Sequence, residues 1–197
     1  MLMSAEHSQL LLVDYQARLM PAIDGRAAVV ANALRLARLA ATLGIPVWGT
    51  EQSPDKLGPN LAPIRAACGR TLAKTHFNAV DDGLADWLRP GAADGRDQLV
   101  LAGCEAQVCL LQTALGLLGA GFAVWVVSDA CGSRSAANHS AAMHRLSRAG
   151  ATLVSTEMVG FEWLRRADHP AFGRWLALVK QADAALADDS GDPDPTP

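Results

Sequence analysis

Charged side chains are scarce in this 197-residue chain, at 19% of the residues, and aromatic side chains supply only 5%. The net charge is −3, and the lysines and arginines are scattered along the sequence. The chain therefore lacks the basic patch that nucleic-acid binding requires, and it carries no RNA- or DNA-reading motif. We expect a small-molecule substrate and no nucleic acid as partner.

Cysteine is also rare. The four cysteines form no C-x-x-C pair and no His–Cys spacing typical of a zinc site. Their positions are Cys68, Cys104, Cys109 and Cys131. So few cysteines in a chain of this length argue against a disulfide framework, so we expect reduced thiols in a cytoplasmic protein.

Targeting and membrane signals are missing as well. The opening residues, MLMSAEHSQLLLVDY, have no basic segment before their short apolar run, so they do not resemble a signal peptide. The uncharged stretch 106–128 imitates a membrane span, but polar residues and glycines interrupt it. A buried helix, a turn and a buried strand explain it better, and we expect no membrane association.

What the sequence does contain is an alternation of short β-rich apolar runs with longer stretches of helical periodicity. The expected strands are 9–14, 46–50, 71–75, 98–103, 123–129 and 151–156. The expected helices are 25–44, 106–121, 135–150 and 168–186. Several runs are continuously hydrophobic, as in strands covered on both faces. The alternation predicts an α/β protein whose parallel sheet has helices on both faces.

The chain is expected to fold as one domain over residues 1–187, followed by a disordered acidic tail, DDSGDPDPTP, at 188–197. Residues 51–70 form the longest stretch without a clear pattern. Loops of this length are usually functional, and this one follows the second expected strand, in a position to cover a site at the carboxyl edge of the sheet.

Polar side chains fall where the expected strands end. Asp14 ends the first, Lys74 lies near the end of the third, and Cys109 lies in the first turn of the helix after the fourth. Because ligands of parallel α/β sheets bind beyond the carboxyl ends of the strands, these residues should converge. Singly, each has a plainer explanation: Asp14 as a cap, Lys74 as a surface residue and Cys109 as a buried thiol. Together they favour a shared chemical role.

The chemistry of such a group is coherent. The positive end of a helix and a nearby lysine both favour the Cys109 thiolate. Asp14 can take the thiol proton and deliver it to a leaving group, while Lys74 holds Asp14 ionised. Backbone N–H groups at the bend before the helix can bind a developing oxyanion.

At these motifs the sequence resembles the isochorismatase-like cysteine hydrolase superfamily, which includes nicotinamidases, carbamoylsarcosine amidase and isochorismatase. The resemblance extends from Gln9 to about Val179 and rests on LLVDYQ (11–16), LAKTHFNA (72–79) and AGCEAQVCLLQTAL (102–115). TEQ (50–52), VVSDACGSRS (126–135) and DHPAF (168–172) are similar to the branch of isochorismatase domain-containing proteins. The resemblance implies that the protein forms a homo-oligomer. It also implies that each chain folds as a three-layer α/β/α sandwich, a Rossmann-like fold whose six-stranded, mostly parallel sheet has the order 3-2-1-4-5-6.

The resemblance also implies roles for particular residues. The catalytic triad falls on Asp14, Lys74 and Cys109. The oxyanion hole falls on the backbone N–H groups of Glu105 and Cys109, with a cis peptide bond between Cys104 and Glu105. By resemblance and position, the substrate-lining candidates are Leu19, Gln52, Phe77 and Cys104.

Departures from the family pattern shape the expected activity. Nicotinamidases bind a metal through an Asp and histidines after the second strand, whereas this chain has Glu51, Gln52 and Ser53 there, so we expect no metal and no cofactor. Isochorismatase itself lacks the cysteine nucleophile, so Cys109 argues against cleavage of a vinyl ether.

The expected function is metal-independent hydrolysis of a small amide or related C–N bond through a Cys thioester. One open alternative is a catalytically silent interaction or regulatory protein. Another is a thiol redox sensor that uses Cys109 with Cys104 or Cys131. The sequence does not name the substrate, because fold alone does not determine it.

Overall fold

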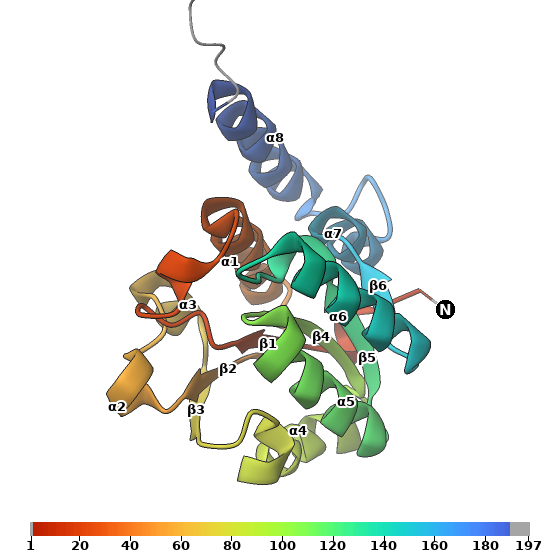
Figure 1. Cartoon of the computed structure of the whole chain (residues 1–197). Helices are drawn as coiled ribbons and strands as arrows, with labels where there is room; N and C mark the ends of the chain where they lie inside the picture. The colour runs from red at the N-terminus through yellow and green to blue at the C-terminus, as the bar shows by residue number, and fades with distance from the viewer. Residues whose placement is uncertain (1, 190–197) are drawn as a thin grey trace, which may run out of the picture.

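The computed structural model describes residues 2–189, which form a six-stranded sheet with helices on both faces (Figure 1). The strand order is β3-β2-β1-β4-β5-β6, and each neighbouring pair is parallel. The predicted sandwich and strand order are confirmed. The strands are β1 (Ser8–Val13), β2 (Val47–Gln52), β3 (Arg70–Lys74), β4 (Gln98–Gly103), β5 (Ala123–Val127) and β6 (Thr152–Val154).

The helices largely follow the predicted positions. They are α1 (Arg26–Thr42), α2 (Pro54–Leu57), α3 (Ala62–Ala67), α4 (Leu84–Ala93), α5 (Leu111–Gly119), α6 (Ala136–Arg148), α7 (Thr156–Leu164) and α8 (Phe172–Asp189). The predicted helix 106–121 begins as a π-helical turn, Ala106–Leu110, before α5. The last helix starts at Phe172 and not at Asp168. The first two residues of the predicted tail, Asp188 and Asp189, belong to α8. The rest of the tail lies outside the described residues and stays a prediction.

Elements absent from the prediction are short or contain helix-breaking residues. α4 carries Pro90 inside it, and α7 carries Gly160 in its middle, so neither has the pattern of a strong helix former. Residues 51–70 are not an irregular stretch, because β2 continues to Gln52 and two short helices follow. Pro54 begins the first of these, since proline is favoured in an opening helical turn.

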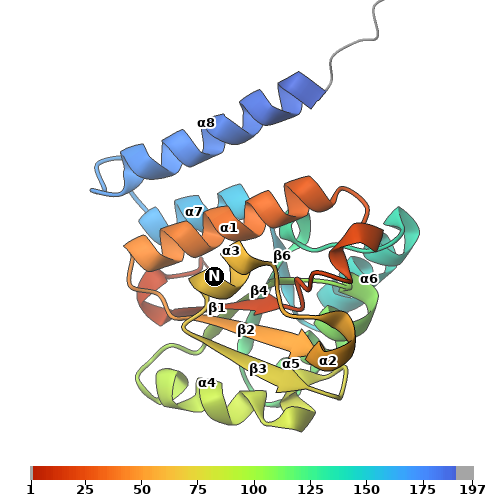
Figure 2. The ribbon, with the colours of Figure 1, turned by 90° about the vertical axis from the view of Figure 1, so that its left-hand side faces the viewer.

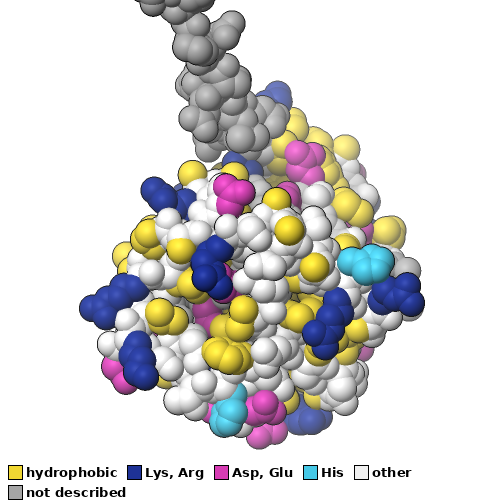
Figure 3. All heavy atoms as spheres, in the orientation of Figure 1, with side chains coloured by type: hydrophobic (Ala, Val, Ile, Leu, Met, Phe, Trp, Pro, Cys, Tyr) yellow, Lys and Arg dark blue, Asp and Glu magenta, His cyan; other side chains and the backbone are white. Residues whose placement is uncertain are grey.

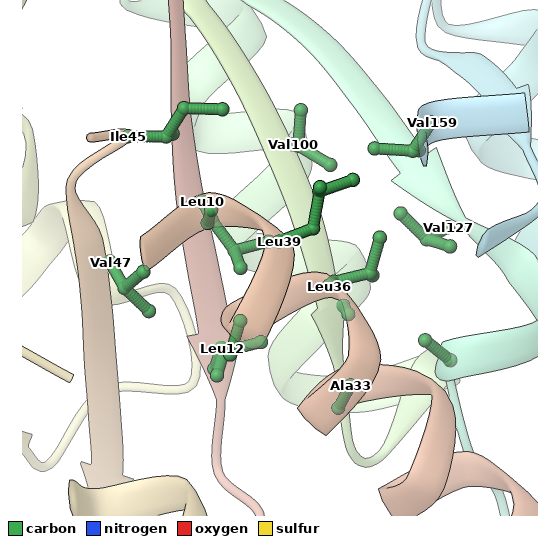
Figure 4. Close-up of a cluster of buried hydrophobic side chains, with 14 of the residues drawn as sticks. Leu10, Leu12, Ala33, Leu36, Leu39, Ile45, Val47, Val100, Val127 and Val159 are labelled. Atoms are coloured by element: carbon green, nitrogen blue, oxygen red, sulfur yellow. The ribbon is translucent and has the colours of Figure 1, made fainter. Parts of the chain in front are cut away.

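Hydrophobic side chains fill both interfaces between the sheet and its helices. On one face, Leu10 and Leu12 of β1 lie in one buried cluster with Leu36 and Leu39 of α1 (Figure 4). The neighbouring Leu11 and other alternate positions face the second cluster, beneath α4, α5 and α6. Figure 2 shows α8 outside the layer of α1 and α7. Within residues 2–189, none of the helices combines the length and apolar character needed to cross a membrane.

The central strands β1 and β4 end side by side, and the site forms where they end. β1 and β4 are buried along their whole length and pair from Ser8 opposite Gln98 to Val13 opposite Gly103. The Cys104 N–H continues this pairing by donating to the Val13 carbonyl at 2.9 Å. The chain after β1 and the chain after β4 therefore leave the sheet side by side, at its carboxyl edge.

Gly103 permits this close approach of β1 and β4. A Cβ atom at Gly103 would lie 2.5 Å from both the Cβ and the carbonyl oxygen of Val13. We expect Gly103→Ala to lower the free energy of unfolding by about 1–3 kcal/mol, because the strand ends must separate. Gly119→Ala is the matched control, since no atom lies within 4 Å of its added Cβ. Urea unfolding of both variants tests this, and equal stabilities would contradict it.

Candidate active site

Asp14 follows β1 directly and has a left-handed backbone conformation, with φ at 52°. Few residues other than glycine adopt this conformation, and aspartate is among those that tolerate it best. The side chain has no exposed surface. Its Oδ1 accepts a hydrogen bond from Thr50 Oγ1 at 2.7 Å, and Oδ2 lies 2.8 Å from Lys74 Nζ. A buried carboxylate is stable only with such partners.

Lys74 is the last residue of the edge strand β3, yet it is only 2% exposed. Its ammonium group is surrounded by oxygens. Besides the Asp14 carboxylate, Nζ donates to Gln52 Oε1 at 2.6 Å and to the carbonyls of His76 and Phe77 at 3.3 and 3.4 Å. Lys74 is therefore not the surface residue that its edge position allows, and its charge is fixed against Asp14.

Cys109 lies in the π-helical turn after β4 and keeps 6% exposure. Its Sγ is 3.8 Å from Gln52 Oε1, within range of a thiol hydrogen bond. Because the same oxygen accepts from Lys74, Gln52 joins the cysteine to the ion pair. The fold thus brings Asp14, Lys74 and Cys109 to one place, as expected from their positions at the strand ends.

The protonation state of Cys109 differs from the expectation. Burial and the negative charge of Asp14 raise the pKa of the thiol to about 12, and the positive charge of Lys74 offsets this only in part. The helix end and Lys74 were expected to favour the thiolate, but burial and Asp14 outweigh them here. Lys74 is already paired with Asp14, and Cys109 is only 6% exposed.

The segment between β4 and Cys109 carries the proposed oxyanion donors. The peptide bond between Cys104 and Glu105 is cis. The Glu105 carbonyl accepts from the N–H groups of Val108 and Leu110, at 3.1 and 3.2 Å. Its own N–H group makes no hydrogen bond with any described part of the chain. A backbone donor without a partner is suited to an incoming carbonyl oxygen.

A loop after β5 holds this segment through hydrogen bonds. The Gly132 carbonyl accepts from the Ala106 N–H at 2.8 Å, and Ser133 Oγ donates to Gln107 Oε1. The Glu105 carboxylate accepts from Arg134 Nε. Neither Thr50 nor Arg134 is predicted as a site residue from the sequence, although both lie in motifs that support the resemblance. Their partners come from other strands, and no local pattern reveals such contacts.

The lining candidates do not all reach the site. Gln52 is central to it, and Phe77 is 50% exposed beside the carbonyl groups that hold Lys74. Cys104 is fully buried and belongs to the hydrophobic cluster under α1, so its role as a lining residue stays a prediction. Leu19 packs against that same cluster. The structure therefore supports Gln52 and Phe77 as lining residues. It places Cys104 in the hydrophobic cluster on the α1 face and Leu19 against it.

The residues that replace the nicotinamidase metal ligands have other partners. Glu51 Oε1 accepts from the Asn60 N–H at 2.8 Å, and Gln52 Oε1 accepts from Lys74. Among residues 2–180, whose side chains the structure describes, no three His, Cys, Asp or Glu side chains lie close enough together to hold a metal ion. Next to β3, residues 53–56 and Lys74 help to line a hollow of about 340 Å³. The segment after β2 starts beside Lys74, because the Ser53 N–H donates to the Lys74 carbonyl at 2.8 Å.

Solved structures of the same fold have similar chain lengths. MAR1 ribonuclease from Caenorhabditis elegans has a TM-score of 0.84 and 28% identity, covering 100% of this chain and 98% of its own. YcaC from Pseudomonas aeruginosa, described with covalent acrylamide, has a TM-score of 0.83 and 29% identity over 97% and 98%. The YcaC gene product of Escherichia coli, described as an octameric hydrolase of unknown specificity, has a TM-score of 0.83 and 26% identity over 95% of each chain.

Sequence comparison agrees with the fold. The chain is 37% identical over 179 residues to isochorismatase domain-containing protein 2A of Mus musculus, covering 89% of this chain and 84% of the relative. The Isochorismatase domain profile matches residues 8–158, which include β1 and all three of Asp14, Lys74 and Cys109. The strand order, the residues at the strand ends and these matches lead to one conclusion: the chain belongs to the isochorismatase family.

Proposed function

We propose that this protein is a cysteine hydrolase that cleaves a small amide or related C–N bond through a thioester on Cys109, without a metal. The observation that carries the proposal is the buried Asp14–Lys74 pair, at 2.8 Å, joined through Gln52 to the Cys109 thiol. The covalent acrylamide described for the Pseudomonas YcaC adds support for a nucleophile on this fold, since acrylamide is an electrophile that nucleophilic side chains attack.

In the first half of the reaction, Cys109 Sγ attacks the substrate carbonyl carbon while its proton passes to Asp14. Transfer during attack is required because the thiol pKa, at about 12, leaves little thiolate beforehand. The carbonyl oxygen becomes an oxyanion that accepts hydrogen bonds from the backbone N–H groups of Glu105 and Cys109. When the intermediate collapses, the C–N bond breaks and Asp14 gives its proton to the departing amine. A thioester remains.

In the second half, Asp14 is again a carboxylate and takes a proton from water as the water oxygen attacks the thioester carbon. The C–S bond then breaks, the sulfur regains a proton from Asp14, and the acid product leaves. Lys74 stabilises the ionised form of Asp14 at the start of each half. Thr50 fixes the other carboxylate oxygen, so that the proton-accepting atom keeps its orientation.

The alternative functions find less support. Cys104 is 0% and Cys131 is 3% exposed, so an oxidant in solution reaches neither side chain directly, which argues against a thiol switch. The name of the Caenorhabditis neighbour points to RNA. The net charge of −3 and the scattered basic residues favour a small substrate over a polyanion.

The first prediction concerns turnover. Wild type should release ammonia from at least one small primary amide, measured with a coupled assay over a panel of amides. Cys109→Ser should lower the rate at least about 10³-fold, as loss of a nucleophile does, whereas Cys68→Ser should retain most of it. Equal activity of wild type and Cys109→Ser would overturn the mechanism. If the protein cleaves RNA and releases ammonia from none of the amides, the ribonuclease alternative is favoured.

A second prediction follows from the raised pKa of Cys109. Alkylation of this thiol by iodoacetamide, followed by mass spectrometry of peptides, should accelerate about tenfold per pH unit from pH 7 to pH 10, because thiolate is the reactive form. Asp14→Asn removes a charge that raises the pKa, so it should speed alkylation at each pH, and Lys74→Met should slow it. A plateau below pH 9 in wild type would contradict the assignment.

We also propose that the chain forms a homo-oligomer, since the Escherichia coli YcaC is described as octameric. Light scattering coupled to size-exclusion chromatography should give a mass of at least twice the 20.7 kDa of one chain. A mass of a single chain at micromolar concentration would show that the site, if active, works in the monomer.

A further inference from the structure

Another hollow lies at the edge of the sheet opposite to the candidate active site. Its volume is about 410 Å³, within the size range of small-molecule sites. Residues 4–6 before β1, Leu43 before β2 and Arg96 before β4 help to line it. The hollow therefore borders the amino ends of the strands. In Figure 2 the strands run from left to right, so this edge is on the left.

Two arginines line the hollow, and the same short segment at the N-terminus binds both of them. Arg96 Nη1 donates to the carbonyls of Ala5 and Ser8, at 2.9 and 3.0 Å. Arg165, directly after α7, donates through Nη2 to the Met3 carbonyl at 2.6 Å. Backbone carbonyls thus orient two guanidinium groups toward one hollow.

The N-terminal segment is itself attached to the fold by side chains. The Ser4 N–H donates to Gln98 Oε1, on β4, at 2.8 Å. Trp163 Nε1, on α7, donates to Ser8 Oγ at 2.9 Å. The arginines are therefore held by a segment that the sheet and a helix fix in place, and their positions do not depend on a loose chain end.

Neither arginine has an acidic partner. Among residues 2–180, no carboxylate lies within ion-pair distance of Arg96 or Arg165. By contrast Arg166, the next residue along the chain, pairs with Asp168 at 3.2 Å. A guanidinium group has five N–H donors, and the bonds to the backbone engage one nitrogen of each arginine. Both groups therefore keep charge and donors for a ligand.

Other lining residues add a donor, apolar surface and one opposing charge. His169 Nδ1 accepts from the Ala171 N–H at 3.1 Å, so the neutral ring carries its proton on Nε2 and is a donor there. Trp163 and Leu164, both buried, contribute apolar surface. Glu6 is the acidic residue of the lining. Two arginines against one carboxylate leave the hollow positively charged.

The gathering of unpaired arginines in this hollow differs from the opposite face of the molecule. Figure 3 looks onto that face, at the carboxyl ends of the strands, and shows basic side chains spread around hydrophobic ones. Since the net charge of the chain is −3, a positive hollow is a local feature and not a consequence of a basic protein.

We propose that this hollow binds the phosphate group of a small organic ligand. A phosphate group has enough oxygens to accept hydrogen bonds from both guanidinium groups, and arginine binds phosphate through paired bonds. The apolar side chains of the lining would contact the organic part of the ligand. The inference is independent of the proposed hydrolase activity, because Cys109 lies at the other edge of the sheet.

Isothermal titration calorimetry with phenyl phosphate, at constant ionic strength, tests this site. Arg96→Gln and Arg165→Gln should each weaken binding about 10- to 100-fold, as loss of a charge-assisted hydrogen bond does. Arg166→Gln is the matched control. It removes the same charge one residue away from Arg165, but that charge is paired with Asp168, so the affinity should stay within about twofold of wild type. Cys109→Ser should bind like wild type.

A further variant covers the case in which loss of an arginine loosens the N-terminal segment. Among residues 2–180, the Glu6 side chain makes no ion pair, so Glu6→Gln removes the opposing charge without breaking one. Phenyl phosphate should bind this variant about three- to fivefold more tightly, the scale of one charge contact near a surface. Unchanged or weaker binding in Glu6→Gln would contradict a site for anions.

Two further probes separate the sources of the phosphate group. Inorganic phosphate should bind more weakly than phenyl phosphate, and phenol should give no measurable heat. If inorganic phosphate binds as tightly as the ester, the phosphate site stands and free phosphate is its ligand. If none of the three probes binds, if phenol binds as tightly as phenyl phosphate, or if Arg166→Gln loses as much affinity as Arg165→Gln, the inference is refuted.

Discussion

The buried ion pair between Asp14 and Lys74 is the contact on which the site depends. Neither charge would be tolerated alone in the interior, because removing one partner leaves the other desolvated, at a cost of about 3–5 kcal/mol. The pair therefore constrains the sheet: the end of β1 and the end of edge strand β3 must stay at the same level, with β2 between them. Thr50 and Gln52, on β2, hold the two partners from that intervening strand.

Together with burial, the same pair accounts for the raised pKa of Cys109. Lys74 is saturated by oxygen atoms from Asp14, Gln52 and two carbonyls, so little of its charge is left for a sulfur anion. What the site offers instead is a thiol within reach of a proton acceptor, in a place where water is scarce. Such an arrangement spares the protein a permanently reactive thiolate and makes proton transfer depend on the presence of substrate.

The fold and the triad positions were accessible from sequence because they follow from local patterns. Apolar runs indicated where the strands lie. Because sites in parallel sheets form at the carboxyl ends of the strands, Asp14, Lys74 and Cys109 were expected at one edge. The resemblance supplied the strand order. What stayed hidden depends on contacts between distant segments. The burial of Cys104 on the α1 face, the raised pKa of Cys109 and the pairing of Arg134 with Glu105 all depend on which side chains meet in space. Two helices were missed because Pro90 and Gly160 interrupt their patterns.

The location of Lys74 on a strand with only one neighbour has a consequence for how the protein loses activity. β3 is bonded to β2 alone, whereas the strands that precede Asp14 and Cys109 lie in the interior of the sheet. Edge elements open through local fluctuations at lower free energy than central ones. Partial detachment of β3 would carry the ammonium away while the sandwich remained folded. Mild denaturant or heat should thus silence the chemistry reversibly, ahead of global melting, and amide hydrogen exchange in β3 should report that transition.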